Sequence, residues 1–180
     1  MRLAAHASAL LVVDLQARLV PVLQGPDELI ARCSILLRAA ARLDVPVLAT
    51  EQYPKGLGHL VPPIRELVGP ERVVPKIAFS AMNDPEPAER IGQLGREMLV
   101  VVGAEAHICV LQTVLDLLAR GRKVAVVADG VGSRRPLDKE VGLARMARAG
   151  AQIVTADMVV FEWMERAGTD AFKELIPLLR

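Results

Sequence analysis

Residues 97–121 read EMLVVVGAEAHICVLQTVLDLLARG, and this stretch decides the fold. Its apolar run at 98–102 has the length and the Val and Leu content of a buried β-strand. The apolar spacing at 107–120 is that of a helix, and Gly121 follows it as a C-terminal stop. A buried strand that leads directly into a helix is the repeating unit of a parallel α/β sheet.

The same alternation continues on both sides of this stretch. Strands are predicted at residues 8–14, 45–50, 72–75, 97–103, 123–129 and 151–156, and helices at 26–43, 85–94, 107–120, 136–149, 158–167 and 169–179. Because these strands are rich in Val, Leu and Ile, both faces of their sheet would be buried beneath helices. No internal repeat, low-complexity tract or linker interrupts the pattern, so a single α/β domain over residues 1–180 is predicted.

The composition argues against several classes of protein. With 22 Lys and Arg against 21 Asp and Glu the net charge is +1, whereas a nucleic-acid-binding protein would carry a basic face or tail. A hydrophobic content of 52% excludes general disorder, and no apolar run approaches the ~18 residues of a membrane-spanning helix. The start resembles a first strand rather than a signal peptide, and two cysteines cannot form a disulfide framework, so we expect a reduced, cytoplasmic protein.

Polar residues at the carboxyl ends of the strands are the candidates for a site, because ligands of open α/β sheets bind there. Cys109 opens the helix that follows the fourth strand. The positive end of a helix dipole and its free N–H groups favour a thiolate, and the same N–H groups can receive an oxyanion. The alternative is a small buried hydrophobe, which is what we expect of Cys33 on the apolar face of a helix.

Two further strand ends carry charges that would complete such a site. Asp14 closes the first strand and could take a proton from a thiol or pass one to a leaving group. Lys76 closes the third strand and could pair with Asp14. Alone, each has an ordinary alternative, a carboxylate that caps a turn and a solvated lysine. The hypothesis of a nucleophilic cysteine rests on the trio of acid, amine and thiol.

Three segments resemble the isochorismatase-like cysteine hydrolase superfamily, which includes nicotinamidases, N-carbamoylsarcosine amidase and isochorismatases. They are ALLVVDLQ (residues 9–16), VPKIAFSAM (74–82) and VVGAEAHICVLQTVLDLLARG (101–121). TEQYPKGLG (50–58), DGVGSR (129–134) and FEWMERAGTDAFKEL (161–175) look more specifically like isochorismatase-domain-containing proteins and related bacterial hydrolases without a settled substrate. The resemblance covers residues 9–180.

The resemblance carries implications for the fold and the site. It implies a Rossmann-like three-layer α/β/α sandwich whose six-stranded parallel sheet has the order 3-2-1-4-5-6, with strands one and four side by side. It implies Cys109 as the nucleophile, Asp14 as general acid and base, and Lys76 as their cationic partner. It also implies a cis peptide between Ala104 and Glu105, and an oxyanion hole made by the backbone N–H groups of Glu105 and Cys109.

The walls of the substrate pocket are predicted less directly. Gln16, Tyr53, Phe79 and His107 stand near the strand ends and are candidates, although ordinary packing explains each of them equally well. GVGSRR at 130–135 lacks the third glycine of a dinucleotide fingerprint, so residues 129–134 are interpreted as a tight turn.

No metal and no cofactor are expected. Nicotinamidases carry an Asp-x-His metal motif and a further His near the second strand end. Here that place holds Glu51, Gln52 and Tyr53, and the nearby histidine is His59. A divalent ion needs several convergent ligands.

The function predicted from these observations is a metal-independent cysteine hydrolase. Its substrate would be the amide or carbamoyl C–N bond of a small molecule, and its intermediate a thioester. The alternatives are hydrolysis of a vinyl ether, as in isochorismatases, a binding or assembly protein with a vestigial site, and a thiol that senses oxidants. Neither nucleic acid nor membrane is expected as a partner, and the apolar composition suggests a homo-oligomer.

Overall fold

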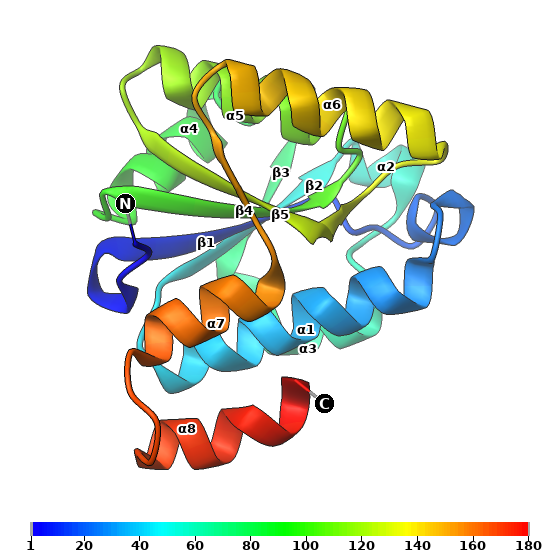
Figure 1. The fold of residues 1–180 in the computed structure, drawn as a ribbon. Coiled ribbons are helices and arrows are strands. Elements are labelled where there is room, and N and C mark those ends of the chain that lie inside the picture. Colours follow the sequence, from blue (N-terminus) through cyan, green and yellow to red (C-terminus); the bar gives the residue numbers. More distant parts are fainter. Residues whose placement is uncertain (1, 180) are drawn as a thin grey trace.

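The computed structural model describes residues 2–179, and its centre is one six-stranded, all-parallel sheet (Figure 1). The strands are β1 (Ser8–Val13), β2 (Val47–Gln52), β3 (Val73–Lys76), β4 (Met98–Ala104), β5 (Lys123–Gly132) and β6 (Gln152–Val154). They lie in the order β3-β2-β1-β4-β5-β6, so that β1 pairs with β2 on one side and with β4 on the other. The predicted fold class and strand order are confirmed.

Helices cover both faces of the sheet. They are α1 (Pro26–Arg42), α2 (Pro54–Leu57), α3 (Pro62–Val68), α4 (Pro85–Gln93), α5 (Cys109–Ala119), α6 (Pro136–Arg148), α7 (Ala156–Met164) and α8 (Asp170–Leu175). Short 3-10 segments lie at Ala5–Ala7, Val20–Val22, Pro70–Arg72 and Ile176–Leu179. Figure 1 shows α4, α5 and α6 on one face of the sheet and α1, α3, α7 and α8 on the other. None of the helices within residues 2–179 is long and apolar enough to cross a membrane.

The sheet divides the hydrophobic core into two clusters. On β1, Leu10 and Val12 pack into the cluster that holds the buried side chains of α1, α3 and α7. Leu11 and Val13 point to the opposite face and pack into the cluster of α4 and α5. Every residue of β1, β2 and β4 is buried, as expected for strands covered on both faces.

The end of β5 differs from the prediction. The strand continues through Gly132 and pairs Val131 with Gly103 of β4 after a shift of register, so the tight turn predicted at 129–134 is wrong. Glycine at position 130 allows β5 to pack closely against β4. A Cβ atom on Gly130 would lie 2.8 Å from the side chain of Val102, so a larger residue would push the two strands apart.

Several predicted boundaries shift because of proline and capping. No helix was predicted between residues 44 and 84, but Pro62 begins α3, and proline is favoured in the first turn of a helix. Helix α7 begins two residues before the predicted start, because the Thr155 hydroxyl accepts a hydrogen bond from the N–H of Met158 and so caps it. Helix α8 ends at Leu175 rather than at residue 179, where the chain tightens into a 3-10 segment.

Candidate active site

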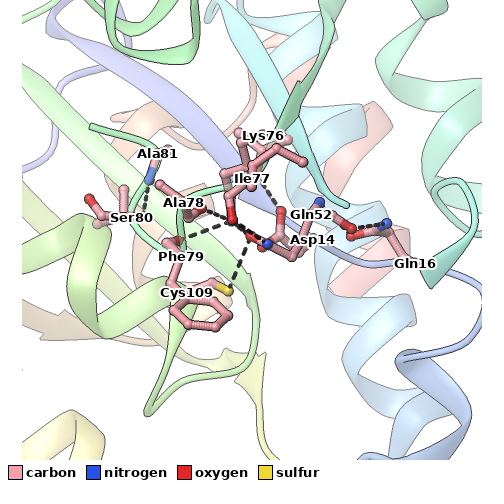
Figure 2. Close-up of polar contacts among 12 residues, drawn as sticks. Asp14, Gln16, Gln52, Lys76, Ile77, Ala78, Phe79, Ser80, Ala81 and Cys109 are labelled. Carbon is pink, nitrogen blue, oxygen red and sulfur yellow. Dashed lines mark hydrogen bonds and ion pairs between the residues drawn. The ribbon is translucent and has the colours of Figure 1, made fainter. Parts of the chain in front are cut away.

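The carboxyl edge of the sheet brings Asp14, Lys76 and Cys109 together. Asp14 directly follows β1, Lys76 is the last residue of β3, and Cys109 is the first residue of α5. The Lys76 Nζ atom lies 2.7 Å from the Asp14 Oδ2 atom, and neither side chain is exposed (Figure 2). The two residues therefore form a buried ion pair, and the alternative of a solvated lysine is excluded.

Asp14 is held in an unusual backbone conformation. Its φ angle is 51°, in the left-handed region that few residues other than glycine adopt. Its N–H donates to the Thr50 carbonyl oxygen at 3.1 Å, and the Thr50 hydroxyl donates to Asp14 Oδ1 at 2.7 Å. On the neighbouring strand, Gly103 has φ +123°, and a Cβ atom there would lie 2.0 Å from the carbonyl oxygen of Val13. The backbones of β1 and β4 thus approach closely just before the carboxylate.

The Lys76 ammonium is saturated with acceptors. Besides Asp14, it donates to Gln52 Oε1 at 2.6 Å and to the carbonyl oxygens of Phe79 at 3.0 Å and Ala78 at 3.3 Å. An ammonium has three hydrogens, so all of them have partners in the resting site. Burial without loss of hydrogen bonds is the condition under which a buried charge is tolerated.

The thiol of Cys109 is protonated at rest. Cys109 is 6% exposed, and its Sγ atom lies 4.0 Å from Gln52 Oε1. Burial and the negative charge of Asp14 raise the pKa of the Cys109 thiol to about 12, although Lys76 acts in the opposite direction. Lys76 lowers the pKa of the thiol, as expected, but burial of the thiol first and the negative charge of Asp14 second outweigh this effect in the resting site.

Cys33 contrasts with Cys109, as predicted. It is fully buried within α1 and donates to the carbonyl oxygen of Gly130 at 3.4 Å. Burial, and to a lesser degree Asp129, raises the pKa of its thiol far above the ordinary range. Both cysteines are free.

A cavity of about 230 Å³ lies over the thiol. Its apolar wall consists of Leu19, Leu57, Phe79 and Ile108, and its polar wall of Asp14, Gln52, Glu105, Cys109 and Arg134. The Ala104–Glu105 peptide is cis, as the resemblance implied. Within residues 2–179, the backbone N–H groups of Glu105 and Cys109 have no hydrogen-bond acceptor. Both residues line the cavity, so two backbone N–H groups without acceptors belong to its wall.

Of the predicted pocket walls, only Phe79 lines this cavity. Gln16 is fully buried and donates from Nε2 to the carbonyl oxygens of Gln52 at 2.9 Å and Gly58 at 2.6 Å. Its carboxamide is thus occupied in fixing the end of β2 and does not face the cavity. Gln16 therefore supports the site indirectly, because it holds the backbone of Gln52 in place.

Tyr53 and His107 also lie outside the cavity of Cys109. Tyr53 is 51% exposed and lines a separate cavity of about 480 Å³, because it follows Gln52 in the chain and turns to the other side. The His107 Nδ1 atom lies 3.0 Å from the Ser133 hydroxyl, and its Nε2 atom lies 3.8 Å from Asp138. These contacts orient the imidazole toward the start of α6.

Three polar groups of the cavity were not singled out from the sequence. The Glu105 carboxylate accepts hydrogen bonds from Arg134 Nε, with distances of 3.1 and 3.0 Å to its two oxygens. Gln52 contacts both Lys76 and Cys109. The period of two in a β-strand was the available signal, because Thr50 and Gln52 must point to the same side as each other. The loop that supplies Arg134 offered no comparable signal.

The residues at the place of the nicotinamidase metal motif make other contacts. Glu51 Oε2 lies 2.9 Å from His59 Nδ1, and Glu51 Oε1 accepts from the N–H of Leu60 at 2.8 Å. Among residues 2–179 there is no group of three or more His, Cys, Asp or Glu side chains that could hold a metal ion.

The fold and the residues at its carboxyl edge define an isochorismatase-like α/β protein. The model of the Isochorismatase domain matches residues 8–158, and the chain belongs to this family. It is 38% identical over 168 residues to isochorismatase domain-containing protein 1 of Salmo salar, covering 93% of this chain and 59% of that one. It is 35% identical over 181 residues to isochorismatase domain-containing protein 2A of Mus musculus, covering 99% and 85%. The chain thus spans little more than half of the fish relative.

Solved structures of similar proteins share the fold over nearly the whole chain. The MAR1 ribonuclease of Caenorhabditis elegans superposes with a TM-score of 0.91 at 36% identity, covering 99% of this chain and 92% of that one. YcaC of Pseudomonas aeruginosa, solved with covalent acrylamide, gives a TM-score of 0.92 at 26% identity, covering 98% and 91%. The YcaC gene product of Escherichia coli, an octameric hydrolase of unknown specificity, gives a TM-score of 0.93 at 24% identity, covering 99% and 90%.

Proposed function

We propose that the protein is a metal-independent cysteine hydrolase that cleaves the amide or carbamoyl C–N bond of a small molecule. The observation that carries the proposal is the buried ion pair of Asp14 with Lys76, together with the cavity that Asp14 and the Cys109 thiol line in common. A cavity of about 230 Å³ lies below the usual range of about 300–1,000 Å³ for ligand pockets, which favours a small substrate. The proposal requires no cofactor.

The first half of the reaction forms a thioester. Because the resting thiol is protonated, its proton passes to the Asp14 carboxylate as sulfur attacks the carbonyl carbon of the substrate. The carbonyl π electrons move to oxygen and give a tetrahedral oxyanion. When this intermediate collapses, the C–N bond breaks and the nitrogen takes the proton from Asp14. Lys76 remains an ammonium throughout and holds the carboxylate in place.

The second half returns the enzyme to its starting state. Asp14, again a carboxylate, takes a proton from a water molecule whose oxygen attacks the thioester carbon. The C–S bond then breaks, and sulfur recovers the proton that Asp14 holds. In both halves the oxyanion would be received by the backbone N–H groups of Glu105 and Cys109, which have no other acceptor within residues 2–179.

One solved relative carries a covalently bound small molecule. The structure of YcaC from Pseudomonas aeruginosa contains covalent acrylamide, and acrylamide is a small amide with an electrophilic carbon. We propose that Cys109 is the group that reacts with such electrophiles in this chain. The free thiols of Cys33 and Cys109 also fit the reduced, cytoplasmic location that we propose.

Substrate screening with matched variants tests the proposal. The panel contains small primary amides, carbamoyl compounds and a vinyl ether, together with an RNA oligonucleotide because one relative is called a ribonuclease. We expect turnover of an amide or carbamoyl compound, its loss in Cys109→Ala, and its retention in Cys33→Ala, since Cys33 lies in the core. Full turnover by Cys109→Ala would rule out the covalent mechanism. Turnover of the vinyl ether alone would favour isochorismatase-type chemistry, and no turnover of any compound would favour a binding protein.

A further inference from the structure

The side-chain amide of Gln52 has one possible orientation. Its Nε2 atom donates to the carbonyl oxygen of Ile77 at 2.7 Å. A carbonyl oxygen only accepts hydrogen bonds, so the amide nitrogen must face it and the amide oxygen must face the opposite way. That oxygen accepts from Lys76 Nζ at 2.6 Å and lies 4.0 Å from the Cys109 Sγ atom (Figure 2).

The backbone of Gln52 is fixed as firmly as its side chain. The Gln16 carboxamide accepts from the N–H of Gln52 at 2.7 Å and donates to its carbonyl oxygen at 2.9 Å. Gln52 is also 8% exposed and ends β2. The amide oxygen is therefore a rigid acceptor within the site, because neither the main chain nor the side chain can turn without losing a buried hydrogen bond.

The position of this oxygen decides how the hydrogens of the site are shared. Lys76 has three hydrogens, and four acceptors lie within reach of them: Gln52 Oε1, the carbonyl oxygens of Phe79 and Ala78, and the Asp14 carboxylate. The sulfur of Cys109 must compete with these four acceptors for a hydrogen of Lys76. The thiol hydrogen of Cys109 has the same amide oxygen within reach as an acceptor, whereas a thiolate would face the negative end of the amide dipole.

We propose that Gln52 is a positioning residue of this site: its amide oxygen holds the Lys76 ammonium on Asp14 and accepts from the Cys109 thiol, so that sulfur keeps its proton until a substrate is bound. The inference rests on the proposed function and adds to it a residue that controls when the nucleophile is formed. The other charged groups of the cavity, Glu105 and Arg134, pair with each other.

Two variants of nearly the same shape as glutamine test the proposal in opposite directions. In Gln52→Met one of the acceptors that compete with sulfur for the Lys76 hydrogens is lost, so the pKa of Cys109 falls. In Gln52→Glu a negative charge is added beside sulfur, so the pKa of Cys109 rises. The rate of iodoacetamide alkylation at pH 8 follows the thiolate fraction, and a shift of about one pH unit changes it about tenfold. We expect about a tenfold increase for Gln52→Met and about a tenfold decrease for Gln52→Glu.

The readout is alkylation of each cysteine by mass spectrometry between pH 7 and pH 10. Cys33 is the internal control for loosening of the fold, because it is fully buried. Gln112→Met is the matched control variant, since Gln112 is exposed on the same helix as Cys109, and we expect it to keep the wild-type rate. A purely structural role would expose the sulfur in both Gln52 variants and accelerate both. Acceleration of both, or rates equal to wild type in both, would overturn the proposal.

This experiment needs no substrate, so it tests the role of Gln52 separately from the proposed hydrolase activity. If alkylation shifts as expected but Cys109→Ala keeps full turnover, Gln52 controls the thiol and the covalent mechanism is wrong. If Cys109→Ala is inactive but the alkylation rates do not shift, the hydrolase proposal stands and the role of Gln52 is refuted.

Discussion

The ion pair between Lys76 and Asp14 predicts a large energetic coupling between these residues. Lys76→Met keeps the length of the side chain and removes its charge. Asp14→Asn keeps the acceptor for the Thr50 hydroxyl, and asparagine tolerates the left-handed backbone conformation at φ 51°. The two single variants and the double variant form a cycle in which each single change leaves one charge buried without its partner.

The expected loss of unfolding free energy follows from the burial of both side chains. Both side chains are 0% exposed and their charged atoms are 2.7 Å apart, so each single variant should lose about 3–5 kcal/mol of unfolding free energy. Lys76→Met should be the more harmful of the two, because it also leaves the Gln52 amide oxygen and the Phe79 carbonyl oxygen without their donor. The double variant contains no unpaired charge, and we expect it to recover to within about 2 kcal/mol of wild type.

Urea unfolding at pH 8, followed by circular dichroism, measures all four proteins. The free energy lost by the double variant should be smaller than the sum of the single losses by at least about 4 kcal/mol. If the single losses simply add, the two charges do not stabilise each other, and the assignment of Lys76 as the partner of Asp14 is wrong. A change in the slope of ΔG against urea would instead indicate that a variant no longer unfolds in two states.

Further predictions concern the thiol, the contact between β1 and β4, and assembly. Because the pKa of Cys109 is raised from 9.0 to about 12, the unfolded thiol ionises first, and we expect unfolding free energy to decrease as the pH rises above about 9. Alkylation of Cys109 should be slower in Lys76→Met than in wild type at the same pH, because the cation that lowers the pKa of this thiol is removed; equal rates would contradict this. Gly103→Ala should cost more than about 3 kcal/mol, since its Cβ atom would lie 2.0 Å from the Val13 carbonyl oxygen, whereas Gly92→Ala in α4, with free space around it, should gain about 0.5–1 kcal/mol. Light scattering should give a particle larger than the 19.4 kDa chain, and a monodisperse monomer would refute self-association.

The sequence predicts those features of the site that follow from the strand order and direction of the sheet. Parallel strands end at one edge, so Asp14, Lys76 and Cys109 could be placed together before any contact was known. The protonation state of Cys109 could not be predicted in this way. It depends first on how deeply the thiol is buried, and then on its distances to Asp14 and Lys76.

The pocket walls show where prediction from sequence fails. Tyr53 and His107 are close to the strand ends in the chain, but their side chains turn toward neighbouring loops. Loop conformation depends on tertiary contacts that no local pattern encodes. Gln52 lies on a strand, where alternation does determine direction, and was overlooked because an amide in a buried strand has no obvious chemistry of its own.

The position of Lys76 in the sheet has a consequence for how the protein fluctuates. Lys76 ends β3, a strand of four residues at the edge of the sheet that pairs only with β2. Short edge strands open locally at a lower free energy than the strands at the centre. Fraying of β3 would withdraw the ammonium while β1 and β4 stay paired, so activity should be lost on heating before the fold is lost. Amide hydrogen exchange would then be faster in residues 73–76 than in β1, and the ion pair with Asp14 would be one restraint on this opening, beside the hydrogen bonds of Lys76 and the pairing with β2.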